Sequence, residues 1–165
     1  MKKKSGQKLY KLAKTIIPGG TTLFSKRSEL HLPNSWPAYF LKAKNSHIWD
    51  LDDNKYLDMF CAVGTNVLGY SNQKINQSVI KSVKKSNMST FNCPEEIYLA
   101  QTIIKHHPWA AMAKFTRSGG EANAVAIRIA RSCTERKNIA FCGYHGWHDW
   151  YLSANLNSKK NLDKH

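Results

Sequence analysis

Long apolar runs, paired cysteines and a signal-peptide core are all missing from this 165-residue sequence. No window approaches the ~18 consecutive apolar residues that a membrane-spanning helix needs, so we expect no membrane partner. The basic start MKKK is not followed by an apolar core. The four cysteines form no C-x-x-C pair, which favours reduced thiols. Together these absences predict a cytoplasmic protein.

Acidic residues are also scarce. The sequence has 11 of them and 25 lysines and arginines, which gives a formal net charge of +14. Such an excess raises the question of a nucleic-acid partner. The lysines occur singly or in small groups, however, without an arginine-rich stripe or a ribonucleoprotein-type aromatic motif. We therefore expect no nucleic-acid partner. The hydrophobic fraction of 42%, with five tryptophans, indicates a packed globular protein rather than a disordered one.

The first 60 residues predict a helix followed by a small antiparallel sheet. Residues 7–17 place apolar side chains at helical spacing, and the sequence Pro18-Gly19-Gly20 ends that helix. Three segments of strand character follow, with Asp52-Asp53-Asn54 as the turn between the last two. The three segments read AYFLKA, HIWDL and KYLDMF. This pattern predicts an antiparallel meander.

The rest of the chain alternates between helical and strand patterns. Helices are predicted over 73–86 and from Pro94 to about His106, where a proline and two glutamates favour a helix start. Short strands are predicted at 113–117 and 138–142, with a helix between them. Strand, helix and strand over ~30 residues form a βαβ unit. The expected fold class is therefore α/β, with the first part of a doubly wound, mostly parallel sheet.

The start of the helix in RSGGEANAVAIRIAR, residues 117–131, allows two interpretations. Ser118 and Glu121 have the spacing of a capping box, which needs no ligand. A helix that begins at the carboxyl end of a strand also offers free N–H groups to an anion, and Gly119 and Gly120 would let a phosphate approach the backbone. The two interpretations are compatible. Neither the P-loop motif nor the G-x-G-x-x-G dinucleotide motif is present.

The loop GYHGWHDWY, residues 143–151, follows the second predicted strand and is rich in aromatic and imidazole side chains. Tyr144 could stack on a flat ligand or cover the core. Cys142, His145, His148 and Asp149 are possible zinc ligands. They lack the separated second pair that structural zinc sites usually have, so we expect no metal site.

Five stretches of this sequence, in order, resemble the amino-terminal part of class III aminotransferases, pyridoxal-phosphate enzymes that include glutamate-1-semialdehyde aminomutase. The stretches are AKTIIPGG, IWDLDDNKYLDMF, PEEIYLAQTII, RSGGEANAVAIRIAR and GYHGWHDW. The resemblance implies an incomplete fold-type-I architecture, with residues 1–60 in the small domain and 61–165 at the start of the large cofactor-binding domain. It also implies a homodimer.

The resemblance further implies pyridoxal 5′-phosphate as the cofactor. Ser118, Gly119 and Gly120 would hold its phosphate, Tyr144 would lie on one face of its pyridine ring, and His145 would lie beside it. Family members commonly carry threonine or serine where this chain has Gly120, so one hydroxyl contact to the phosphate would be missing here. This chain has GGTTLFSKR where the aminomutase has the motif Ser-Pro-x-Arg. A general aminotransferase is therefore an alternative to an aminomutase specific for the semialdehyde.

In this family the lysine that forms the Schiff base lies farther along than residue 165, so no catalytic residue is expected in this chain. The resemblance thus implies the N-terminal portion of an enzyme that moves an amino group between a small-molecule donor and a carbonyl substrate, inactive by itself. The alternative is a non-catalytic phosphate-ligand or interaction module that keeps only the phosphate cradle.

Overall fold

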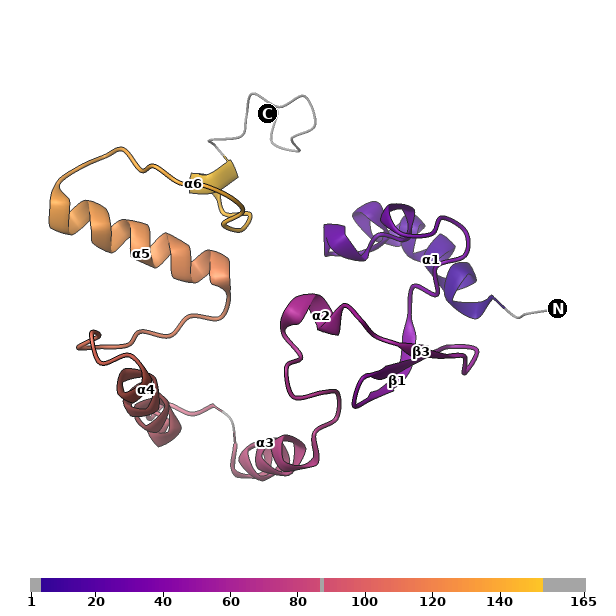
Figure 1. Ribbon diagram of the computed structural model, residues 1–165, viewed down its shortest axis with the longest axis horizontal. Coiled ribbons are helices and arrows are strands. Elements are labelled where there is room, and N and C mark those ends of the chain that lie inside the picture. The colour runs from indigo at the N-terminus through magenta and orange to yellow at the C-terminus, as the bar shows by residue number, and fades with distance from the viewer. Residues whose placement is uncertain (1–3, 87, 153–165) are drawn as a thin grey trace. The chain divides into compact units, whose positions relative to one another are not determined.

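The computed structural model describes residues 4–86 and 88–152. The chain divides into two compact units, Met1–Ser89 and Thr90–His165, and Figure 1 follows the chain through them from indigo to yellow. Each unit is described by itself. These units are not the two domains expected from the sequence. The boundary between the small and the large domain after residue 60 stays a prediction.

The first unit begins with helix α1, Ser5–Ile16, which starts two residues before the predicted position. Tyr10 and Ala13 on this helix are the buried hydrophobic residues of the described chain. Three single-turn 3-10 helices follow, η1 (Pro18–Gly20), η2 (Phe24–Lys26) and η3 (Ser28–Leu30). The proline at the start of η1 ends α1 as predicted, since proline has no backbone N–H to continue the helix.

The predicted meander is confirmed. Strands β1 (Phe40–Lys44), β2 (His47–Asp50) and β3 (Lys55–Leu57) form an antiparallel sheet in the order β1-β2-β3. Asp50, only 7% exposed, closes the turn between β2 and β3. Its carboxylate accepts hydrogen bonds from the N–H groups of Asp52 and Asn54 and from the Tyr56 hydroxyl. Burial alone would raise the pKa of Asp50, but these bonds lower it.

The remainder of the first unit contains two helices, α2 (Cys61–Gly64) and α3 (Gln73–Lys85). Asn72 caps α3, because its side chain accepts from the N–H groups of Lys74 and Ile75. Tyr70 donates a hydrogen bond to Asp58, and burial followed by this bond raises the pKa of Tyr70 to about 12. The helix predicted over 73–86 is thus confirmed to within one residue.

The second unit contains helices α4 (Pro94–His106), α5 (Gly119–Thr134) and α6 (Asp149–Leu152). The predicted bounds of α4 are confirmed. The strands predicted at 113–117 and 138–142 are wrong, since neither segment is part of a strand. A strand exists only where a neighbouring segment accepts its backbone hydrogen bonds. Within the described residues neither segment has such a neighbour, so these residues alone do not complete the predicted βαβ unit.

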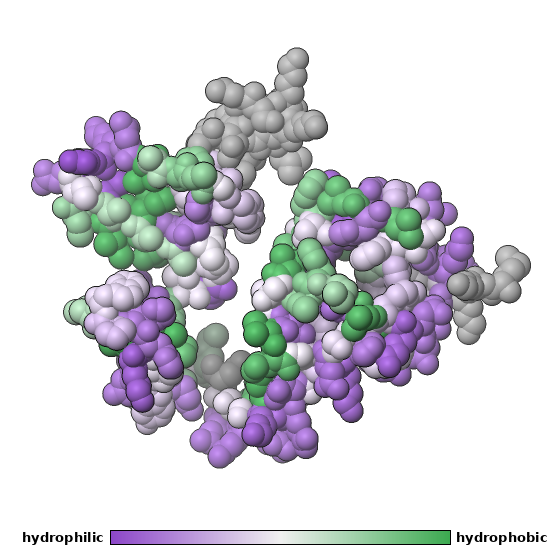
Figure 2. Space-filling model, viewed as in Figure 1, coloured by the Kyte–Doolittle hydropathy of each residue, from purple (hydrophilic) through white to green (hydrophobic). Residues whose placement is uncertain are grey.

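Helix α5 has an apolar stripe formed by Ala122, Val125, Ala126, Ile129 and Ala130, and most of this stripe is exposed. Ile129 on this stripe is 53% exposed, and no residue described in the second unit is buried. Figure 2 likewise shows green, hydrophobic surface on both units. The helix pattern was correctly predicted from the sequence, whereas its packing partner was not.

Candidate cofactor-binding site

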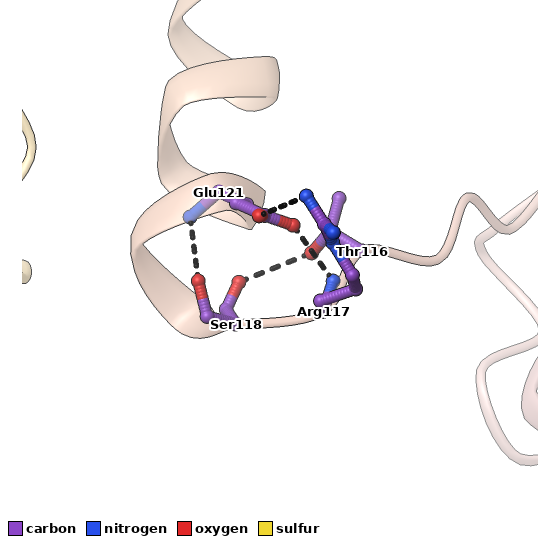
Figure 3. A network of polar contacts seen from close by, with 4 residues as sticks. All are labelled: Thr116, Arg117, Ser118 and Glu121. Carbon is purple, nitrogen blue, oxygen red and sulfur yellow. Dashed lines mark hydrogen bonds and ion pairs between the residues drawn. The ribbon is translucent and has the colours of Figure 1, made fainter.

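Ser118 begins helix α5 and caps it. Its backbone is extended, with φ −149° and ψ 160°, and its Oγ accepts a hydrogen bond from the Glu121 N–H at 3.2 Å. The Thr116 hydroxyl donates to the Ser118 carbonyl oxygen at 3.1 Å, and Figure 3 shows these contacts around one turn of chain. The first half of the predicted capping box is therefore confirmed.

The second half of the capping box differs from the prediction. The Glu121 carboxylate accepts from the Arg117 N–H at 2.9 Å and from the Arg117 Nη2 at 3.1 Å (Figure 3), rather than from the N–H of Ser118. The backbone bond and then the side-chain bond from Arg117 lower the pKa of Glu121. The carboxylate is therefore held on the Arg117 side of the turn, and the backbone of the two glycines is left uncovered.

Gly119 and Gly120 form the first turn of α5. Within residues 4–86 and 88–152 their backbone N–H groups have no hydrogen-bond acceptor, as expected for a helix start. A Cβ added at Gly119 would meet no atom within 4 Å, so there is open space beside it. The positive end of the helix dipole lies at the same place, which favours a negatively charged group.

The loop after residue 142 packs against this turn. The Asn123 side chain on α5 donates to the His145 carbonyl oxygen at 3.1 Å. A Cβ added at Gly146, whose φ is +98°, would lie 3.2 Å from the Cα of Gly120. The structure thus brings the predicted phosphate turn and the predicted aromatic loop together, although they are far apart in the sequence.

The two ring residues predicted in this loop have different surroundings. Tyr144 is 76% exposed, and its ring meets Tyr151 edge-on at 6.0 Å. The Nε2 of His145 lies 2.7 Å from the Cys142 carbonyl oxygen, and its ring packs near Phe141 and Trp150. The His145 side chain therefore contacts residues of its own loop, whereas most of the Tyr144 ring is exposed.

Two residues at this site were missed by the sequence analysis. Asn123 ties α5 to the loop, and the sequence carried no signal for it beyond a polar residue within an apolar stripe. His148 was considered only as a zinc ligand, yet its ring lies against Gly120. The signal that could have found it was the second glycine, which has no Cβ to keep a neighbouring ring away.

The described residues contain neither a candidate metal site nor a helix that could span a membrane. No group of three or more histidine, cysteine, aspartate or glutamate side chains in that part of the chain could hold a metal ion. The thiols Cys61, Cys93, Cys133 and Cys142 are free of disulfides. None of the helices described is both long and apolar enough to cross a membrane.

A helix start with uncovered N–H groups favours a phosphate or another anion. Residues 32–164 match the family model for class III aminotransferases, and the chain belongs to this family. It is similar to 3-aminobutyryl-CoA aminotransferase of Cloacimonas acidaminovorans, at 33% identity over 88% of this chain and 35% of that protein. Glutamate-1-semialdehyde 2,1-aminomutase of Wigglesworthia glossinidia brevipalpis is 39% identical over 91% of this chain and 34% of that protein.

Solved structures agree with this membership. The FumI protein of Sphingopyxis sp. MTA144 superposes with a TM-score of 0.78 at 31% identity, over 86% of this chain and 34% of that one. An omega-transaminase of Sphaerobacter thermophilus superposes with a TM-score of 0.79 at 29% identity, over 88% of this chain and 33% of that one. The fold is that of the N-terminal part of fold-type-I, pyridoxal-phosphate-dependent aminotransferases. The chain spans about a third of the length of the curated relatives it matches.

Proposed function

We propose that this chain supplies the phosphate-binding part of the cofactor site in a class III aminotransferase or aminomutase, with pyridoxal 5′-phosphate as the cofactor. The observation that carries this proposal is the contact between the aromatic loop and the glycine turn at Gly120 and Gly146. It brings the uncovered N–H groups of the first turn of α5 close to the loop that carries Tyr144, within one unit.

The residues present fit the cofactor. The free N–H groups of Gly119 and Gly120 and the Ser118 hydroxyl would hold the phosphate, and the open space at Gly119 admits it. Tyr144 would lie on one face of the pyridine ring, with His145 beside it. When bound, pyridoxal 5′-phosphate serves as an electron sink for carbanion chemistry next to an amino group. The chain's own residues would orient the cofactor and supply hydrogen-bond donors to its phosphate.

Amino-group transfer is proposed for a longer polypeptide that also supplies the Schiff-base lysine of the family. Its substrates would be a small-molecule amino donor and a carbonyl compound, and its assembly would be a cytoplasmic homodimer. In that enzyme, residues 1–60 would belong to the small domain and 61–165 to the large one. The relatives include aminotransferases and an aminomutase. The proposed reaction of the longer polypeptide is therefore either transfer of an amino group between two molecules or its shift within one molecule.

Amide NMR on the ¹⁵N-labelled chain tests the cofactor site. Pyridoxamine 5′-phosphate is the suitable probe, because it has no aldehyde to react with surface lysines. We expect saturable shifts at Gly119, Gly120 and Tyr144. Pyridoxamine, which has no phosphate, should leave the two glycines unshifted. Shifts spread over the lysine-rich surface, without saturation at the glycine turn, would overturn the proposal.

Catalysis separates the proposed enzyme from a module that only binds phosphate ligands. The longer polypeptide, loaded with pyridoxal 5′-phosphate, should convert an amino donor to its carbonyl product. A polypeptide that binds the probe at the glycine turn but converts no donor would favour the non-catalytic alternative.

A further inference from the structure

The imidazole of His148 occupies the space that a side chain at position 120 would need. A Cβ added at Gly120 would lie 2.4 Å from the Cδ2 of His148 and 2.8 Å from its Nε2. Both distances are shorter than van der Waals contact between such atoms. The glycine and the imidazole therefore fit each other, and neither position tolerates a larger group without movement of the other.

Backbone conformation does not explain the glycine. Gly120 is not among the residues with positive φ, so an L-amino acid could adopt its backbone angles. Glycine in a helix costs about 1 kcal/mol relative to alanine, although less in the first turn. The nearest atoms that a side chain at position 120 would meet are those of the His148 ring.

The imidazole is available for a ligand. His148 is half-buried, and neither of its ring nitrogens has a hydrogen-bond partner among the described residues. The Glu121 carboxylate interacts electrostatically with His148, and Arg117 holds this carboxylate through two hydrogen bonds. The ring therefore lies against Gly120, in the first turn of α5.

We propose that His148 is an additional phosphate-binding residue, whose ring N–H donates to the phosphate in place of the side chain that Gly120 lacks. This inference rests on the proposed function, because it needs the phosphate at the start of α5. It assigns to His148 the role of a polar contact that discriminates phosphorylated from unphosphorylated ligand. In this arrangement the Gly120 N–H donates to the phosphate, and the absence of a side chain at Gly120 leaves space for the His148 ring.

Calorimetric titration with pyridoxamine 5′-phosphate and with pyridoxamine tests the role of His148. H148A should weaken binding of the phosphorylated probe about tenfold, as expected for one hydrogen bond to a charged group. Binding of pyridoxamine should not change. H148Q keeps an N–H donor and should recover part of the loss. H106A removes an exposed histidine at the end of α4 and should bind like the wild-type chain, which controls for the loss of one imidazole.

The ³¹P resonance of the bound probe gives a second readout. Its shift should differ between the wild-type chain and H148A, and agree between the wild-type chain and H106A. If the wild-type chain binds with shifts at Gly119 and Gly120 but H148A binds equally well, the role of His148 is overturned and the cofactor site stands. If the wild-type chain shows no such shifts, both proposals fail. Should H148A lose the fold of α5, H148F decides, because phenylalanine keeps a ring at this position without an N–H donor. Wild-type affinity of H148F with an unchanged ³¹P shift would overturn the role.

Discussion

The Tyr10 hydroxyl on α1 donates a hydrogen bond of 2.8 Å to the Glu29 carboxylate on η3. Tyr10 is only 6% exposed, and the same carboxylate forms an ion pair of 3.1 Å with Lys14, one helical turn farther along α1. This contact joins the first helix to the 3-10 turns that follow it. In a unit with few buried residues, it is a major link between α1 and the rest.

Removal of the Tyr10 hydroxyl should weaken this link. Y10F is expected to lower the free energy of unfolding by about 1 kcal/mol, because the buried ring stays and one hydrogen bond to a charged group is lost. Urea unfolding followed by circular dichroism measures the change. Y39F is the control in the same unit, since the structure shows no hydrogen bond from its hydroxyl among the described residues. Equal midpoints for Y10F and Y39F would contradict the assignment.

The charge on Glu29 should make the stability of the first unit depend on pH. The hydrogen bond from Tyr10 and then those from the backbone and Lys14 lower the pKa of Glu29 from 4.5 to about 2. A carboxyl group with a lowered pKa in the folded state contributes stability that is fully present above pH 4.5 and is lost as the pH falls toward 2. The difference in unfolding free energy between the wild-type chain and E29Q should therefore shrink over this range. A difference that stays constant from pH 7 to pH 2 would show that ionised Glu29 adds nothing.

The Ser118 cap should hold the first turn of α5 in place. S118A is expected to cost this helix about 1 kcal/mol, because the Glu121 N–H loses its acceptor. Amide hydrogen exchange at the first turn of α5 measures the effect. S118N should preserve the slow exchange, since asparagine is also a good cap. S132A, at an exposed position inside the same helix, is the control and should leave the first turn unchanged.

The contact between Gly120 and His148 should appear as coupling between two substitutions. G120A alone should destabilise the packing of the loop on α5, because its Cβ collides with the imidazole. In the H148A background the same change should cost less by about 1 kcal/mol, since the collision is gone. Thermal unfolding of the four combinations measures the coupling. G119A, whose Cβ meets open space, serves as the matched control and should show no coupling to H148A.

Local patterns in the sequence predicted the helices and the meander well. The spacing of apolar residues marked α1, α3, α4 and α5, and the residues Asp52-Asp53-Asn54 marked the turn between β2 and β3. These features depend on residues within a few positions of one another, so they can be predicted without knowledge of the fold. The family membership was likewise predicted from five short sequence segments, and the match to the family model for class III aminotransferases confirms it.

The strands at 113–117 and 138–142 could not be predicted correctly in this way. Their apolar residues have strand character, but a strand needs a second segment that pairs with it, and this depends on the path of the whole chain. The capping box shows the same limit on a smaller scale. The Ser118 contact was predicted correctly, whereas the Glu121 carboxylate accepts hydrogen bonds from Arg117 instead of from the Ser118 N–H.

The amino-acid sequence by itself determined the long helices to within about two residues, the turn of the meander, and the family to which the chain belongs, because those properties depend on residues close together in the chain. Only the tertiary structure decided that the His148 ring fills the space beside Gly120 and that the Tyr10 hydroxyl reaches Glu29. Contacts between residues far apart in the chain depend on the path between them, and no local pattern specifies that path.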